Sequence, residues 1–313
     1  MNFSQFVASG AAAISEGAVV ERIRRDPALG FDPHVLTGGL IYDPTGRARL
    51  AEIHTDYWTS ARAAGAPILA FTDTWRCSEA LVEKSAFRGR PVNQDNVRFL
   101  REICAPFQGG SPIYLGGLVG PSGDAYKPAE SLPRRAARNF HRQQVEALAS
   151  AGVDFLFLAT APAVDEALGV ADAMAETGLP YLISFVIRRT GAVLDGAPLG
   201  QAMARIDAET SRPPAGFSVN CVHARVLETA LDAIAATHPD AARRILAFQA
   251  NTGDREVEEL DGSDELLTEP PATFAEDLDR LRRRYGLRVL GGCCGTDGGH
   301  IAALARRFSC EGI

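Results

Sequence analysis

Short apolar stretches alternate with longer amphipathic stretches along almost the whole chain. The short stretches are rich in aliphatic and β-branched residues, which indicates strands, and the longer ones repeat their apolar positions at helical spacing. The expected strands cover residues 12–16, 67–72, 113–119, 154–159, 181–187, 217–222, 244–248 and 287–292. The expected helices cover residues 50–64, 93–104, 133–151, 164–177, 199–208, 224–236, 273–285 and 298–308.

This alternation predicts an α/β fold with a parallel sheet, and eight such units in 313 residues favour a closed (β/α)8 TIM barrel over an open doubly wound sheet. Polar residues and glycines gather after the expected strands, where barrel enzymes place their active sites. They are Glu16-Gly17, Thr72-Asp73, Gly120-Pro121, Thr160, Asn220-Cys221, Asn251-Thr252 and Cys293-Cys294. The first strand is not followed by the glycine motif of dinucleotide-binding folds. We therefore expect a single barrel domain over residues 1–313.

Two segments between these elements are long for loops inside a compact domain. Residues 76–93 follow the second expected strand, and residues 251–272 follow the seventh and are acidic. Loops of this length are typical of lids and binding segments, so we expect one of these roles for each.

Composition narrows the class of partner. Hydrophobic residues make up 46% of the chain, which is enough for a large core, and the formal net charge is -7. No block of lysine and arginine stands out, which argues against nucleic acid or an anionic membrane as the main partner. Small-molecule chemistry is therefore favoured.

The sequence also indicates a reducing compartment. Its six cysteines do not form the dense framework of a small secreted domain. The N-terminal residues 6–14 lack the positive region of a signal peptide, and no apolar run approaches the ~18 residues of a membrane span. We expect a cytoplasmic protein, and the sequence leaves open whether it forms a homo-oligomer.

Two adjacent cysteines, Cys293 and Cys294, lie between glycines directly after the last expected strand. The glycines allow the backbone to bend until both sulfurs converge. Cys221 ends the sixth expected strand, so all three sulfurs would lie on one rim of the barrel. Three cysteines would leave the fourth position of a Zn²⁺ ion open, as catalytic zinc sites do, and a bound thiol would be deprotonated.

Other interpretations of the cysteines stay open at this point. Free cysteine is commonly buried as a small hydrophobe, which is our expectation for Cys77, Cys104 and Cys310. A disulfide between Cys293 and Cys294 is a further alternative.

Several motifs resemble those of the homocysteine S-methyltransferase family. GGCCGTDGGHI at residues 291–301 resembles the family's GGCCxTxPxHI, and Asn220-Cys221 resembles the Asn-Cys that its members carry after another strand. IHTDYWTSARAAGAPILAFTDTW at residues 53–75 resembles its H-x-x-Y, AGA and TNTY segments, and GGLVGPSGDAY at residues 116–126 resembles its AGSIGPxG segment. The resemblance covers about residues 14–308 and is that of a divergent member.

The resemblance implies a zinc-dependent barrel enzyme that moves a methyl group onto a thiol. Cys221, Cys293 and Cys294 would hold Zn²⁺, and the thiolate of homocysteine or a related small thiol would be the nucleophile. The chain has no cobalamin or folate module, which favours a small methylsulfonium compound as the methyl donor.

Substrate residues are also implied by the resemblance. Glu16-Gly17 stands where the family has Asp-Gly, whose carboxylate holds the amino group of homocysteine. Ala159-Thr160 stands where the family has Glu-Thr, so the second carboxylate that normally holds this amino group is replaced by a methyl group. Asp73 is a candidate replacement acid near the pocket.

Two further residues are candidates on chemical grounds. Trp75 follows the second strand and is placed to contact a sulfonium or quaternary ammonium donor through a cation–π interaction, unless it only packs on the barrel rim. Asn220 precedes Cys221 and is a candidate for orienting a substrate carboxylate or a ligand sulfur.

Two alternative functions are compatible with the sequence. One is a methyltransferase that works with a separate corrinoid protein. The other is a non-enzymatic thiol-redox barrel in which Cys293 and Cys294 form a reversible disulfide.

Overall fold

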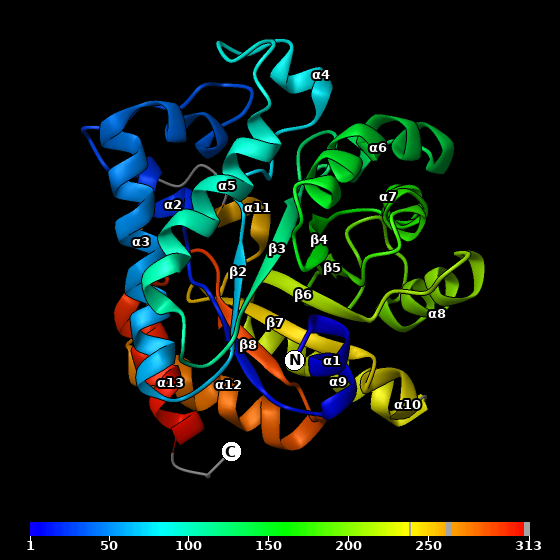
Figure 1. Ribbon diagram of the computed structural model, residues 1–313. Helices are drawn as coiled ribbons and strands as arrows, with labels where there is room; N and C mark the ends of the chain where they lie inside the picture. The colour runs from blue at the N-terminus through cyan, green and yellow to red at the C-terminus, as the bar shows by residue number, and fades with distance from the viewer. Residues whose placement is uncertain (238, 261–264, 310–313) are drawn as a thin grey trace.

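The computed structural model describes residues 1–237, 239–260 and 265–309, and its centre is a closed barrel of parallel strands (Figure 1). The strands pair in chain order, and the last pairs with the first, Ala13 opposite Val289. They are β1 (Ala13–Ser15), β2 (Ile68–Phe71), β3 (Ile113–Val119), β4 (Phe155–Ala161), β5 (Tyr181–Phe185), β6 (Gly216–His223), β7 (Ile245–Asn251) and β8 (Val289–Gly292). The predicted (β/α)8 barrel and its eight strands are confirmed.

Helices surround the barrel on its outside (Figure 1). The long ones are α3 (Pro44–Ala63), α5 (Val92–Cys104), α6 (Arg134–Ser150), α7 (Val164–Glu176), α8 (Leu199–Glu209), α9 (Ala224–Thr237), α12 (Pro271–Tyr285) and α13 (Gly298–Ser309). The short ones are α1 (Phe3–Ser9), α2 (Val20–Arg24), α4 (Glu79–Val82), α10 (Pro239–Ala242) and α11 (Val257–Leu260), with 3₁₀ turns at Thr37–Tyr42, Ala105–Phe107 and Pro128–Glu130.

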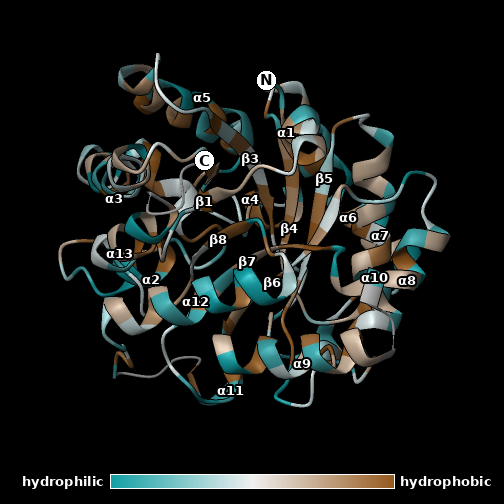
Figure 2. Ribbon diagram, turned by 90° about the horizontal axis from the view of Figure 1, so that it is seen from below, coloured by the Kyte–Doolittle hydropathy of each residue, from teal (hydrophilic) through white to brown (hydrophobic). Residues whose placement is uncertain are grey.

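Alternate residues of the strands face two different apolar clusters. Along β4, Leu156 and Leu158 join the large cluster that contains the apolar faces of the surrounding helices. Phe155, Phe157 and Ala159 join a smaller cluster formed by strand residues and α1. Because successive side chains of a strand point to opposite faces, the smaller cluster fills the inside of the barrel. Figure 2 shows these strands as mainly hydrophobic, with hydrophilic residues on the helices around them.

The short helix α1 closes the N-terminal end of the barrel. Phe3 stacks on Phe155 at the start of β4, with 4.1 Å between ring centroids, and meets Tyr114 of β3 edge-on at 5.6 Å. Phe6 is fully buried beside Tyr114, and an Asn2 capping box starts the helix. The candidate functional residues lie at the opposite end of the barrel, where the strands have their C-termini.

Helix α3 starts earlier than the expected residue 50. Asp43 accepts a hydrogen bond from the Gly46 N–H and Pro44 occupies the first turn, so a cap that the apolar pattern does not contain extends the helix. In the described residues of the two long segments expected to be loops there is a short helix, α4 in residues 76–93 and α11 in residues 251–272. In the part of the chain that is described, we find no helix with the length and apolar character needed to cross a membrane.

The packing of α1 generates a stability prediction. Phe3→Ala should lower the free energy of unfolding by about 3–5 kcal/mol, because it leaves a cavity against Phe155 and Tyr114. Phe3→Leu, which keeps most of the volume, should cost clearly less. Denaturant unfolding of both variants measures the difference, and equal stability of the wild type and Phe3→Ala would show that α1 is not part of the cooperative core.

Candidate active site

Three cysteine sulfurs converge at the C-terminal rim of the barrel. Cys221 lies near the end of β6, and Cys293 and Cys294 directly follow β8. The Sγ atom of Cys221 is 2.9 Å from that of Cys293 and 3.7 Å from that of Cys294, and all three sulfurs lie within 4.8 Å of one another. The expected juxtaposition of these residues is confirmed, although they are far apart in sequence.

The backbone around the sulfurs has an unusual local conformation. Cys221 has a φ of 61°, rare for a residue with a side chain, and its carbonyl accepts a 2.8 Å hydrogen bond from the Asn251 amide. After β8 the chain turns back so that the Thr296 N–H and hydroxyl both donate to the Cys293 carbonyl. Gly295 in this turn has a φ of 83°, and a Cβ there would lie 1.8 Å from a Thr252 oxygen.

Electrostatics at the cluster favour one thiolate at a time in the absence of a cation. Hydrogen bonds from Cys293 and Cys294 lower the pKa of Cys221 well below its ordinary value. Hydrogen bonding to Cys221 raises the pKa of Cys293, and that of Cys294 is raised by hydrogen bonding to Cys221 and Cys293 and by burial. Three thiolates therefore require a bound cation. Three soft sulfur donors on one open rim fit the donor set of a catalytic zinc ion.

Tyr126, in the loop after β3, contacts the same cluster. Its hydroxyl donates a 3.3 Å hydrogen bond to the Cys221 sulfur, and its own N–H is capped by the Asp124 carboxylate. Buried Glu166 of α7 fixes the loop by accepting the N–H groups of Ser122 and Leu132. Sequence patterns could not place the Tyr126 hydroxyl on a sulfur, because this contact depends on how the loop packs.

Glu16, at the end of β1, is the centre of a buried polar network. Its Oε1 accepts hydrogen bonds from His54 Nδ1 and Trp58 Nε1, both at 2.7 Å, and its Oε2 accepts the Phe71 N–H at 2.9 Å. The other nitrogen of His54, Nε2, lies 3.1 Å from the Asp73 carboxylate. One histidine on α3 thus bridges two of the expected substrate residues, and neither His54 nor Trp58 was predicted to act in the site.

His54 is held as an imidazolium. Burial alone opposes its charge, but the carboxylates of Glu16 and Asp73 outweigh this effect and raise the pKa of His54 from 6.5 to about 10. The group therefore links β1, α3 and the end of β2 by two charge-assisted contacts.

Asn220 links the ends of three strands. Its Oδ1 accepts the Thr160 N–H at 2.9 Å and the Ser184 hydroxyl at 2.6 Å. Thr160 has a φ of 52°, and its hydroxyl accepts a 3.0 Å hydrogen bond from the Trp75 indole. These contacts bring three of the expected substrate residues, Asn220, Thr160 and Trp75, together on the rim.

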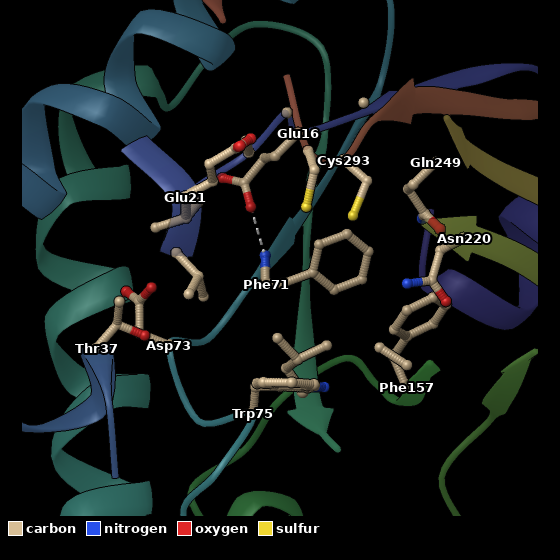
Figure 3. Close-up of a pocket in the computed structure, with 18 of the residues that line it drawn as sticks. Glu16, Glu21, Thr37, Phe71, Asp73, Trp75, Phe157, Asn220, Gln249 and Cys293 are labelled. Carbon is tan, nitrogen blue, oxygen red and sulfur yellow. Dashed lines mark hydrogen bonds between the residues drawn. The ribbon is translucent and has the colours of Figure 1, made fainter. Parts of the chain in front are cut away.

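Two cavities meet at the sulfur cluster. The first, of about 160 Å³, lies over Glu16, Gly17 and Asp73 (Figure 3). The second, of about 230 Å³, extends towards Tyr126 and helix α11. Residues lining both are Val20, Glu21, Trp75, Leu118, Ala159, Asn220, Cys293 and Cys294. Cys293 and Cys294 therefore border both cavities, and Cys221 borders the second.

Gly17 has a steric role in the first cavity. A Cβ at this position would lie 2.9 Å from both the Thr296 hydroxyl and the Tyr57 ring.

Outside the site, Cys77 is fully buried and Cys104 is half-buried, as expected for small hydrophobes, whereas Cys310 lies outside the described residues.

A (β/α)8 barrel with a three-cysteine centre between two rim cavities defines a barrel enzyme with a candidate metal site. Residues 13–308 match the family model described as homocysteine S-methyltransferase, so the chain belongs to the homocysteine S-methyltransferase family. This confirms the family and the enzyme class that the sequence motifs indicated.

Individual relatives are distant. Homocysteine S-methyltransferase from Escherichia coli is 28% identical over 276 residues, covering 82% of this chain and 84% of that protein. Homocysteine S-methyltransferase 4 from Zea mays is 29% identical over 229 residues, covering 72% of this chain and 61% of that protein, which is less than two thirds of its length.

Solved structures share the fold. The metallated form of the homocysteine methyltransferase MmuM from Escherichia coli superposes with a TM-score of 0.76 and 21% identity, covering 97% of this chain and 99% of that one. The apo form of the same protein gives a TM-score of 0.67 with 23% identity, covering 95% of each chain.

The His54 network predicts a pH dependence of stability. Because the pKa of His54 is raised on folding, its contribution is complete below about pH 6.5 and is lost as the pH rises through about 10. The free energy of unfolding of the wild type should therefore fall across this range. In His54→Gln this part of the fall should disappear, and denaturant unfolding at several pH values measures both. The same pH profile in the two proteins would contradict a charged His54.

Proposed function

We propose that the protein is a zinc-dependent S-methyltransferase that moves a methyl group from a small methylsulfonium donor to a thiol, homocysteine or a related one. The observation that carries this proposal is the convergence of Cys221, Cys293 and Cys294 between two cavities. The first cavity, over Glu16, Gly17 and Asp73, would hold the thiol acceptor and is called the acceptor cavity below. The second cavity would hold the donor, with the sulfur cluster between the two.

Zinc fits this centre better than a hard cation, because all three donors are sulfur. Cys221, Cys293 and Cys294 would hold it, and Tyr126 would donate a hydrogen bond to one of the ligand sulfurs. When bound, Zn²⁺ would lower the pKa of the acceptor thiol, so that the acceptor is present as a thiolate at neutral pH. The metallated form of the E. coli relative supports a metal in this fold family.

The transfer itself is a displacement at carbon. The acceptor thiolate forms a bond to the donor methyl carbon, the bond from this carbon to the sulfonium sulfur breaks, and its electron pair stays on the donor, which leaves as a neutral thioether. The protein would contribute by holding the two reactants in line and away from water. A mouse relative, 24% identical over 272 residues, is named S-methylmethionine–homocysteine S-methyltransferase BHMT2, which supports a sulfonium donor.

The surrounding residues would position the two substrates. Trp75 lines both cavities and would face the positive sulfonium with its ring, while its indole N–H stays bonded to Thr160. Glu16, Gly17 and Asp73 line the cavity assigned to the acceptor.

Removing one sulfur ligand tests this function. Cys293→Ser should lower zinc affinity by at least about 100-fold, because two cysteines cannot hold the ion as three do, and methyl transfer from S-methylmethionine to homocysteine should fall by at least as much. Zinc content by elemental analysis and product formation measure the two effects.

Cys104→Ser is the matched control, since this cysteine is half-buried on α5, outside the sulfur cluster. It should keep wild-type zinc and activity. The same zinc content in wild type and Cys293→Ser would contradict the proposed metal centre.

A further inference from the structure

The acceptor cavity has a mostly apolar wall with few polar groups. Phe71, Leu118, Phe157 and Ala159 form much of its lining. Its specificity for the non-sulfur end of a thiol must therefore come from the small number of polar side chains that it contains.

The carboxylates in this wall are already engaged with the protein. Glu16 accepts hydrogen bonds from His54, Trp58 and the Phe71 N–H, which use three of the roughly four lone-pair positions of a carboxylate. Asp73 pairs with the same imidazolium and lies across the cavity from Cys293 (Figure 3). The His54 imidazolium already lies between the two carboxylates, so an incoming ammonium group would have to approach a like charge to reach them.

A third carboxylate, Glu21, is also occupied. It accepts the N–H of Gly295 and pairs with Arg25 at 3.5 Å. At the end of β4, where an acid would face the shared part of both cavities, the chain has the methyl group of Ala159.

Two amide donors of the cavity lining lack partners among the described residues. Asn220 is fixed in orientation, because its Oδ1 accepts a backbone N–H that can only donate, so its Nδ2 points towards the cavity (Figure 3). This Nδ2 has no hydrogen-bond partner among the described residues. Gln249 accepts the Ser218 hydroxyl on its Oε1, and its buried Nε2 is unpaired in the described part of the chain. Buried donors without partners call for a ligand with an oxygen acceptor.

We propose that this cavity recognises its thiol through a carboxylate or carbonyl oxygen held by Asn220 and Gln249, and not through an ammonium group. Mercaptocarboxylates without an amino group are then acceptors alongside homocysteine. This inference rests on the proposed function, because it assigns the acceptor class of the same site. It identifies Ala159 as the residue that removes selection for an amino acid.

Two analogues of homocysteine test the contributions of its amino group and its carboxylate separately. One is γ-mercaptobutyrate, which is homocysteine without its amino group, and the other is aminopropanethiol, which is homocysteine without its carboxylate. With S-methylmethionine as donor, kcat/KM for γ-mercaptobutyrate should lie within about threefold of the value for homocysteine, and that for aminopropanethiol should be at least about 10-fold lower. A preference of 10-fold or more for homocysteine over γ-mercaptobutyrate would overturn the inference.

A substitution at Ala159 tests whether a carboxylate at this position introduces a preference for the ammonium group of homocysteine. Ala159→Glu should raise the kcat/KM ratio of homocysteine to γ-mercaptobutyrate by about 10-fold or more, because the new carboxylate pairs with the ammonium and repels a bare mercaptoacid. Ala159→Gln has the same size without the charge and should leave the ratio unchanged. An equal shift in both variants, or none in Ala159→Glu, would contradict the role assigned to this position.

Binding measured without the methyl donor distinguishes this inference from the proposed function. The protein loaded with Co²⁺ can be titrated with each thiol, and the sulfur-to-cobalt absorption reports thiol binding. In one outcome no thiol is methylated, but γ-mercaptobutyrate binds as tightly as homocysteine and better than aminopropanethiol. This result would contradict the proposed methyl transfer and support the proposed recognition of the carboxylate. If methyl transfer occurs but only homocysteine binds, the proposed recognition of the carboxylate is contradicted and the proposed methyltransferase function is supported.

Discussion

Three sulfur atoms held within 4.8 Å of one another are the constraint on which the rest of this structure depends. Cys221 and the Cys293-Cys294 pair come from β6 and β8, which flank β7, so the parallel order of these three strands brings the cysteines to one rim. The left-handed backbone of Cys221 and the turn after β8 aim the sulfurs at a common point. Thiolates so close need a cation, and the proposed zinc ion would supply it.

The other buried charges of the rim follow the same logic. Glu16 and Asp73 follow neighbouring strands, and the imidazolium of His54 between them contacts both carboxylates and compensates one of their two negative charges. This arrangement fixes one wall of the first cavity, the one proposed for the acceptor. The opposite wall is fixed by Asn220, whose oxygen is used by the protein and whose nitrogen faces the cavity.

Features that follow from local sequence patterns could be predicted from the sequence, and features that depend on how the elements pack could not. The eight strands and the three converging cysteines follow from periodicity and from glycines around Cys293 and Cys294. The expected substrate residues do line the rim, but their partners were not foreseen. His54 lies inside an ordinary helical pattern, and Gln249 inside an ordinary strand, so only the assembled barrel reveals that one bridges two acids and the other has an unpaired donor.

X-ray absorption spectroscopy of the zinc-loaded protein tests the central claim most directly, since it counts the sulfur ligands of the ion. The account predicts three sulfurs at about 2.3 Å with one lighter ligand, and a fourth sulfur at the same distance once homocysteine is added. Fewer than three sulfurs in the free protein, or an unchanged ligand set after addition of the thiol, would contradict a thiol-activating zinc centre at Cys221, Cys293 and Cys294.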